Sequence, residues 1–347
     1  MRAVRMTAPR EPLADAELPR PTPGAQEVLV RVRAAGICHS DVHYRAGRSR
    51  VEPLPLTLGH EVAGEIVAVG HGVPEHRVGE RVALHYLVTC GNCLWCTTQR
   101  EMFCERALML GHFTDGGWAE YIVVPSRNAV HVPDNVPIEQ AAIMMCSSAT
   151  SLHALRQGRL AVGERVLVIG AGGLGMSAVQ LAHILGAQQV IAMDRDAGKL
   201  AQAAQFGADT VLAEAHATPA QLAERVREAT GGHGVDVVLD LVTSEATIAL
   251  ALKAVAPRGR VVVVGLNDRP LPVDTYAGLI GREATLVGSN DHTLQELEEL
   301  MGYAADGRLR LGEVVARRVR LEAAVIDGVL DELEEGRGVV RTVVVPE

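Results

Sequence analysis

The sequence lacks the long hydrophobic runs that are typical of membrane proteins and the basic clusters that are typical of proteins that bind nucleic acids. No stretch approaches the ~18 consecutive apolar residues of a membrane span, and the N-terminal residues MRAVRMTAPREPL have no apolar centre like that of a secretory signal. Lysine occurs only at Lys199 and Lys253, no run of basic residues is present, and the net charge is −9. These absences predict a cytoplasmic protein with neither a membrane partner nor a nucleic acid partner.

The chain has no internal repeat and no low-complexity segment, and its length points to two domains. With 347 residues, of which 48% are apolar, the chain exceeds the size at which one hydrophobic core keeps growing. The part up to about residue 148 contains short alternating runs, such as Val28, Val30 and Val32, which predict strands with one solvated face.

From Gly163 onward the pattern changes to alternating strands and helices. The apolar run RVLVIG, a glycine-rich turn, the helical spacing of 176–185 and the run VIAMD predict a βαβ unit. Further apolar runs at 235–241 and 259–266 predict a mostly parallel sheet with both faces covered. Two acidic helices, near 293–305 and 322–335, and a final strand RTVVV complete the predicted α/β organisation.

No cysteine is left over once two candidate metal sites are assigned. Cys90, Cys93, Cys96 and Cys104 lie within one short segment, and four thiolates are enough to close the tetrahedral shell of a zinc ion. Since cytosolic thiols stay reduced, such clustered cysteines favour metal binding over disulfides. A closed shell leaves no position for a substrate, so this site is predicted to stabilise a loop.

Cys38, His60 and Cys146 suggest a second site of a different kind. Two cysteines and one histidine leave the fourth zinc position open for water or an alcohol. Open zinc lowers the pKa of a bound hydroxyl and polarises a carbonyl. A histidine next to a glutamate, as in His60-Glu61, is also common as a simple surface or core pair, so spacing alone leaves both readings open.

A dinucleotide-binding turn follows the first strand of the βαβ unit. Gly170, Gly172 and Gly175 form Gly-x-Gly-x-x-Gly at the start of a helix, where backbone N–H groups and the helix dipole favour a pyrophosphate. Asp194 ends the next strand and is placed to accept the ribose hydroxyls of an adenosine, which favours NAD over NADP. Arg195 offsets part of this preference, since it offers a cation to a 2′-phosphate.

Together these motifs resemble the zinc-dependent medium-chain alcohol dehydrogenases, and the resemblance covers nearly the whole chain. The family's zinc signature appears as Gly59-His60-Glu61-Val62-Ala63-Gly64, with Gly70 and Val73 at the expected further spacing, and ICHSDVH contains its metal cysteine and relay residues. The resemblance implies a strand-rich GroES-like catalytic domain at 1–148 and 288–347, and a Rossmann-type, doubly wound NAD-binding domain at 149–287.

The resemblance also implies roles for individual residues. Cys38, His60 and Cys146 correspond to the catalytic zinc ligands, Glu61 to a carboxylate that can replace water in the shell, and Asp41 to the partner that orients His60. Ser40 corresponds to the hydroxyl that takes the alcohol proton and passes it through the nicotinamide ribose to His43. The implied cofactor contacts are His39 and Arg341 at the pyrophosphate, Lys199 and Arg195 near the ribose, the turn residues Gly170, Gly172, Gly173, Leu174 and Gly175, and the backbone of Val264, Gly265 and Leu266 at the nicotinamide amide.

We therefore expect an enzyme that binds two zinc ions and NAD and reversibly oxidises primary or secondary alcohols by hydride transfer from a zinc-bound alkoxide. Tyr86 and Trp118 are candidate pocket residues, although both are equally consistent with a hydrophobic core. A polyol or amino-alcohol dehydrogenase of the same family, acting on sorbitol, butanediol or threonine, is the enzymatic alternative; a non-catalytic zinc- and NAD-binding protein is the other. The resemblance further implies a homo-tetramer, or a dimer, that pairs through a sheet edge near VVVVG at 261–265.

Overall fold

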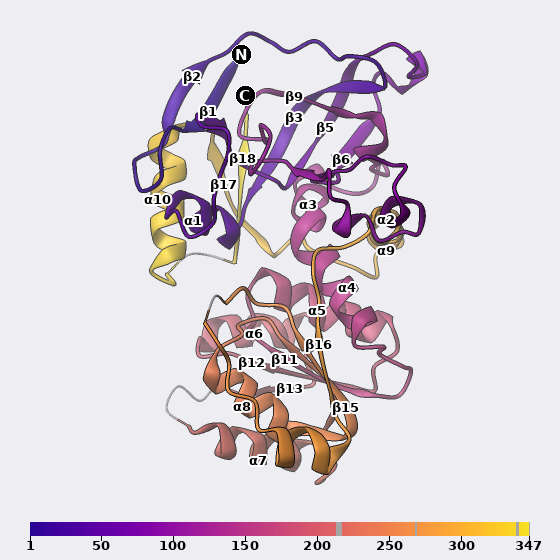
Figure 1. Ribbon diagram of the computed structural model, residues 1–347, viewed down its shortest axis with the longest axis vertical. Coiled ribbons are helices and arrows are strands. Elements are labelled where there is room, and N and C mark those ends of the chain that lie inside the picture. Colours follow the sequence, from indigo (N-terminus) through magenta and orange to yellow (C-terminus); the bar gives the residue numbers. More distant parts are fainter. Residues whose placement is uncertain (213–216, 268, 338–339, 347) are drawn as a thin grey trace. The chain divides into compact units, whose positions relative to one another are not determined.

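Two β-sheets organise the chain, one in each of two units (Figure 1). The computed structural model describes residues 1–212, 217–267, 269–337 and 340–346. One unit comprises Met1–Cys146 and Thr293–Glu347, and the other comprises Ser147–His292. Within the described ranges, no helix combines the length and the apolar character needed to cross a bilayer.

The first unit is built on a seven-stranded, mostly antiparallel sheet. Its strands, in spatial order, are β10 (Ala129–His131), β6 (Arg81–Leu84), β5 (Val62–Val69), β3 (Glu27–Ile37), β18 (Arg341–Val345) and β17 (Val315–Arg320), and β9 (Tyr121–Pro125) also pairs with β3. The predicted strand around Val28, Val30 and Val32 is confirmed: these side chains are buried in β3, whereas Arg31 stays partly exposed. The final strand RTVVV is confirmed as β18, which joins β3 and so returns the end of the chain to this sheet.

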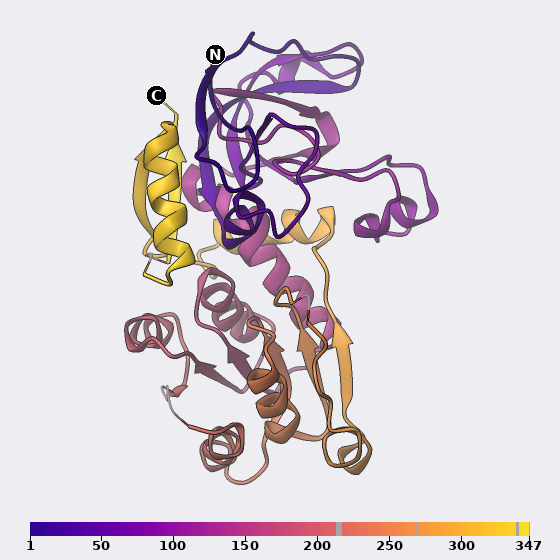
Figure 2. The same ribbon diagram turned by 60° about the vertical axis from the view of Figure 1, so that its left-hand side comes forward.

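Helices and two small sheets complete the first unit. The small sheets are β2 (Ala14–Glu17), β1 (Arg2–Met6) and β4 (Leu56–Thr57), and separately β7 (Leu87–Val88) and β8 (Leu108–Met109). The helices are α1 (His39–Arg45), α2 (Leu94–Thr97), α3 (Ile138–Ile143), α9 (Leu294–Ala305) and α10 (Ala323–Glu334). The two predicted acidic helices are confirmed as α9 and α10; Thr293 caps α9 and accepts a bond from the Glu296 backbone N–H at 3.2 Å. Figure 2 shows the loop that carries α2 extending away from the sheet of this unit.

The second unit is a six-stranded parallel sheet with helices on both faces (Figure 1). The strand order is β13 (Thr210–Leu212), β12 (Gln189–Met193), β11 (Arg165–Ile169), β14 (Val235–Asp240), β15 (Val255–Val263) and β16 (Thr285–Gly288). The helices are α4 (Ala149–Gln157), α5 (Gly173–Ile184), α6 (Ala197–Gln205), α7 (Pro219–Ala229) and α8 (Glu245–Ala254). The predicted doubly wound α/β fold is confirmed, and the strand order reverses between β11 and β14, which is where such sheets bind ligands.

The expected pairing edge near VVVVG is wrong. Those residues belong largely to β15, which is hydrogen-bonded to β14 on one side and to β16 on the other. The edge strand is β16, a four-residue segment, TLVG, with mostly exposed side chains. Because β16 is short, exposed and ends in glycine, it has neither the apolar run nor the alternation that identified the other strands.

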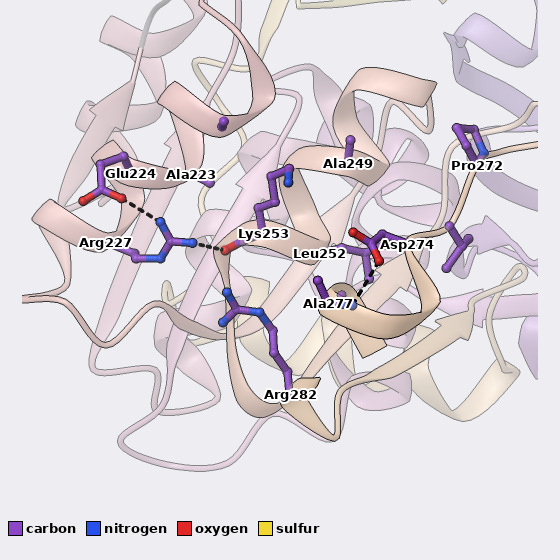
Figure 3. Close-up of a pocket in the computed structure, with 13 residues that line it drawn as sticks. Ala223, Glu224, Arg227, Ala249, Leu252, Lys253, Pro272, Asp274, Ala277 and Arg282 are labelled. Atoms are coloured by element: carbon purple, nitrogen blue, oxygen red, sulfur yellow. Dashed lines mark hydrogen bonds and ion pairs between the residues drawn. The ribbon is translucent and has the colours of Figure 1, made fainter. Parts of the chain in front are cut away.

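A hollow of about 660 Å³ lies in the wall of the second unit, between α7, α8 and the segment that begins at Pro272 (Figure 3). Arg227 in this wall donates to Glu224 Oε2 at 2.7 Å and to the carbonyl oxygen of Lys253 at 2.8 Å. The first bond lies within α7 and the second joins α7 to α8, so Arg227 holds the two helices together. Among the described residues, none that the sequence predicts for the site lines this hollow.

Candidate functional site

The four clustered cysteines form a closed ligand set in the loop around α2. The sulfur of Cys96 lies 3.8 Å from that of Cys90 and 3.5 Å from that of Cys93, and all four candidate ligand atoms, Cys104 included, lie within 4.8 Å of one another. Two thiolates on one tetrahedral zinc, each at ~2.3 Å, stand ~3.8 Å apart. The Asn92 backbone N–H lowers the pKa of Cys90 to about 5, which favours the thiolate that a metal needs. This set therefore fits a zinc ion that no substrate reaches.

A second set brings together Cys38, His60, Glu61 and Cys146, all of them buried in the first unit. Cys38 Sγ and Cys146 Sγ lie 4.0 Å apart, close to the separation that a shared zinc imposes. Among the described residues, His60 Nε2 and Glu61 Oε1 are buried without a hydrogen-bond partner. A buried nitrogen without a partner is costly unless a ligand satisfies it, so these residues fit a zinc held by two sulfurs and one nitrogen with room for a further ligand.

The backbone around His60 and Cys38 explains how this set is held. Gly59 has φ +91°, and a Cβ on it would lie 2.5 Å from the ring of Trp118, so only glycine permits the turn that presents His60. Cys38 is the N-cap of α1, and its N–H donates to Asp41 Oδ2 at 2.8 Å. Asp41 Oδ1 lies 3.4 Å from His60 Nδ1, and this leaves Nε2 as the nitrogen for a metal.

Neighbouring groups shift the pKa values of two members of the second set, His60 and Cys38. Burial acts to lower the pKa of His60, but Asp41 and Cys38 outweigh it and raise that pKa to about 10. The hydrogen bond from Cys146, opposed by burial and helped by His60, holds the pKa of Cys38 well below its ordinary value. A dication that binds here would therefore meet a thiolate and would displace a proton from His60.

Arg341 lies against this set instead of on the surface. At the start of β18 it has a 4% exposed side chain, and its Nη2 donates to Glu61 Oε2. This ion pair joins the last strand of the unit to the residue after His60. The resemblance places Arg341 at a pyrophosphate, whereas in this structure Arg341 is paired with Glu61.

The residues implied in proton transfer sit on or beside α1. Cys38 Sγ lies 3.8 Å from Ser40 Oγ, so the hydroxyl is adjacent to a candidate zinc ligand. The ring of His43 packs edge to face on that of His39, with 5.3 Å between centroids. Burial, and then the charges of His39 and Arg48, lower the pKa of His43. His43 is thus neutral near pH 7 and able to accept a proton.

The glycine turn of the second unit has open space where a pyrophosphate is expected. Gly170 follows β11 with φ +101°, and a Cβ on Gly175 would lie 2.0 Å from the Gly170 carbonyl oxygen, so helix and strand approach too closely for any other residue. Gly172 caps α5, and a Cβ on it would meet no described atom within 4 Å. The α5 N-terminus, with Gly173 and Leu174 as its first residues, therefore offers free N–H groups to an anion.

Asp194 is fixed beside this turn. Its Oδ2 accepts from the Ala171 N–H at 2.7 Å and its Oδ1 from the Asp196 N–H at 3.0 Å. Arg195 is exposed and Lys199 half-buried on the same segment. Val264, Gly265 and Leu266 follow β15, at the same carboxyl edge of the sheet as the glycine turn. The second unit thus fits a dinucleotide such as NAD.

Comparison with known proteins relates both units to one family. Residues 24–134 match the alcohol dehydrogenase GroES-like domain, and residues 173–305 match the zinc-binding dehydrogenase family. The NAD-dependent alcohol dehydrogenase of Saccharolobus solfataricus is 36% identical over 356 aligned residues that cover 100% of both chains. The chain belongs to the zinc-dependent medium-chain alcohol dehydrogenase family. It is a zinc-containing dehydrogenase, and its ligand sets and glycine turn fit zinc and NAD.

Two further relatives bear on the fold and on the substrate. The alcohol dehydrogenase of the archaeon Aeropyrum pernix has a solved structure that aligns with a TM-score of 0.89 at 32% identity, covering 100% of both chains. The L-threonine 3-dehydrogenase of Symbiobacterium thermophilum is 35% identical and covers 97% of this chain and 95% of its own. The family therefore includes members named for different alcohols at nearly equal similarity to this chain.

Aromatic rings surround His60, the candidate zinc-ligand histidine of this dehydrogenase. Tyr86 lies edge to face on His60 with 5.5 Å between ring centroids, as suits a residue beside the site. Trp118 is fully buried, and its Nε1 donates to the Gly36 carbonyl oxygen at 3.4 Å. Trp118 therefore supports the Gly59 turn from within the core.

Sequence reasoning missed Tyr44 and His112. Tyr44 lies 6.3 Å from His60 by ring centroid, and His112 stacks on Tyr44 at 4.5 Å with 13° between the planes. The only sequence signal for Tyr44 is its place directly after His43, inside the segment with the relay residues. His112 lies in an irregular loop and carries no motif, so only the fold reveals it.

Proposed function

We propose that the protein is an NAD-dependent alcohol dehydrogenase that reversibly converts primary or secondary alcohols into aldehydes or ketones. The observation that carries the proposal is the buried set of Cys38, His60 and Cys146, with the Ser40 hydroxyl 3.8 Å from Cys38 Sγ. A set with two sulfurs and one nitrogen leaves a position for substrate, and the adjacent hydroxyl supplies a proton acceptor.

The unit Met1–Cys146 with Thr293–Glu347 is the proposed catalytic domain, and Ser147–His292 the proposed NAD-binding domain. When bound, zinc supplies a Lewis acid that lowers the pKa of an alcohol hydroxyl, and NAD accepts the hydride. Asp41 orients His60 as a ligand, Ser40 takes the hydroxyl proton, and His43, neutral because its pKa is lowered, is the acceptor nearer to solvent.

The competing function is oxidation of a polyol or an amino alcohol, because a threonine dehydrogenase is about as similar to the chain as the alcohol dehydrogenases are. Steady-state rates with NAD across aliphatic, benzylic and diol substrates, with threonine and sorbitol included, separate the two. Saturation by simple alcohols supports the proposal. Saturation by threonine or a polyol, with simple alcohols inert, overturns it in favour of the alternative.

Removing the charge of Asp194 should relax the choice of cofactor. A carboxylate ~4 Å from a 2′-phosphate repels it by about 4 kcal/mol per charge pair at an effective dielectric of ~20, an upper figure at this wet edge. We expect Asp194→Asn and Asp194→Gly both to lower the NAD/NADP ratio of kcat/KM by about one to two orders of magnitude. Asp194→Asn retains an oxygen that can accept from the Ala171 N–H, so it separates the charge from support of the turn. Unchanged discrimination in both variants would show that Asp194 does not face the ribose.

We also propose a homo-tetramer that works in the cytosol. The edge strand β16, with Leu286 36% exposed, supports pairing between subunits through this edge. Six cysteines without a disulfide among the described residues suit a reducing compartment. Light scattering of the purified protein tests the assembly, and a monomeric mass would exclude it.

A further inference from the structure

One short helix carries most of the side chains proposed for proton transfer. Cys38 caps α1, and Ser40, Asp41 and His43 lie within its seven residues, His39–Arg45. Helices shorter than ~12 residues are not stable alone in water. The orientation of α1, and with it the positions of Ser40 and His43, must therefore come from what α1 packs against.

The N-terminal half of α1 is held at the candidate metal set. The Cys38 N–H donates to Asp41 Oδ2, and Asp41 is fully buried beside His60. The buried side chains of Val42 and Tyr44 fix the inner face of the helix in the core.

The C-terminal end of α1 is held by Arg45 against α10, which lies beside α1 within the first unit (Figures 1 and 2). The Arg45 side chain is 12% exposed. Its Nη1 donates to Asp327 Oδ1 at 3.0 Å, and its Nη2 donates to Asp331 Oδ1 at 2.5 Å. Asp327 and Asp331 are four positions apart on α10, so one planar guanidinium spans adjacent turns of that helix.

Neighbouring contacts extend this anchor. Asp327 Oδ2 accepts from the Leu13 N–H at 2.9 Å, so the same carboxylate also binds a third segment. One turn further along α10, Glu334 Oε1 accepts from Arg48 Nη2 at 2.7 Å. Isolated surface pairs contribute little to stability, but Arg45 is mostly buried and makes bonds to two carboxylates at once, which orders its side chain.

We propose that Arg45 is a positioning residue for proton transfer, which holds the C-terminal end of α1 on α10 and thereby sets where Ser40 and His43 stand. This inference rests on the proposed function. With Arg45 released, α1 stays attached at Cys38 and Asp41 and along the buried side chains of Val42 and Tyr44, but it loses the contact with α10 that sets its rotation about these anchors. His43, two residues from Arg45, moves most and the metal ligand Cys38 moves least. Proton transfer is then impaired while the metal set stays intact.

The test compares Arg45→Met with Arg317→Met in zinc-loaded protein. Arg317 Nη2 donates to Glu332 Oε2 at 2.6 Å, so it also anchors α10, but from β17 instead of α1. We expect Arg45→Met to lower kcat for alcohol oxidation by at least about tenfold, and to shift its pH profile, with zinc content unchanged. This loss is smaller than the ~10²- to 10⁴-fold that a positioned acid–base group contributes, because Ser40 and His43 are displaced and not removed. Arg317→Met should leave kcat and the pH profile as in the native protein, and Arg45→Lys should lie between, because an ammonium cannot span both carboxylates.

A second readout needs no turnover. NMR titration of the His43 ring reports its surroundings, which include His39, Arg48, Cys38 and Glu334. Burial is the main cause that lowers the pKa of His43, so greater exposure of the His43 ring should raise this pKa in Arg45→Met. If Arg45→Met does not fold, Asp331→Ala replaces it, since that carboxylate is 64% exposed and its loss removes only one of the bonds that Arg45 makes.

The outcomes separate the inference from the function on which it rests. A native protein that oxidises no alcohol contradicts the proposed function, while the His43 titration still tests the position of α1. Equal effects of Arg45→Met and Arg317→Met on kcat, with the pH profile and the His43 titration unchanged, would overturn the positioning role and leave Arg45 with a purely structural one.

Discussion

Replacing Ser40 by alanine should lower kcat for alcohol oxidation by about 10²- to 10⁴-fold, the range that a positioned acid–base group contributes. Ser40 Oγ is the hydroxyl next to the candidate metal set, 3.8 Å from Cys38 Sγ. Without it, an alcohol proton has no acceptor beside the ligands, and His43 is separated from the reacting group. Steady-state kinetics over a range of pH measure the loss, and the part of the pH profile that reports the relay should disappear.

Ser40→Thr is the matched control, because threonine retains a hydroxyl at the same branch point. We expect Ser40→Thr to recover most of the rate and the native pH profile. If Ser40→Ala keeps both the native kcat and the native pH dependence, Ser40 is not in the proton path. That result would favour the alternative of a protein that binds zinc and NAD without catalysis.

The features that the sequence predicts well are those built from neighbours in the chain. The apolar strand β11, the turn at Gly170 and the start of α5 are consecutive, and the collision that a Cβ on Gly175 would make occurs with the carbonyl of Gly170, five positions away. The sulfur atoms of Cys90, Cys93 and Cys96 are likewise held by one loop. Local geometry decides such features, so residue type and spacing are enough to recognise them.

Contacts between distant segments are not predictable in the same way. Glu61 and Arg341 are separated by 280 positions, and Arg45 and Asp327 by 282. With 42 acidic and 33 basic residues in the chain, charge alone does not select these partners; the placement of β18 and α10 does. The resemblance implied a pyrophosphate contact for Arg341, but no local pattern predicted its buried partner Glu61. The misplaced sheet edge near VVVVG has a related origin, since each residue of β15 that pairs with β16 has its partner 25 positions further along the chain.

Mutation of one ligand in either metal set should remove the zinc of that set and leave the other zinc in place. Native protein should contain about two zinc ions per chain, one for each ligand set. Cys146→Ala removes a ligand from the set that contains His60, and Cys104→Ala removes one from the loop set. Elemental analysis after dialysis against a chelator should find about one zinc in each variant. The loop set then keeps three of its four ligands, or the His60 set two of its three, and an incomplete ligand set holds zinc less tightly.

The two variants should differ in the property that they lose: Cys146→Ala should lose activity, and Cys104→Ala should lose stability. Cys146→Ala should abolish alcohol oxidation, because the open position and its Lewis acid are lost together, while the melting temperature changes little since alanine suits the buried position. Cys104→Ala should lower the melting temperature, because structural zinc contributes directly to folding free energy, and its folded fraction should still oxidise alcohol, because the loop contains none of the residues proposed for the reaction. An active Cys146→Ala with two zinc ions would remove Cys146 from the ligand set. An inactive Cys104→Ala that keeps its native melting temperature would place the chemistry at the loop and contradict the division between a structural and a catalytic zinc.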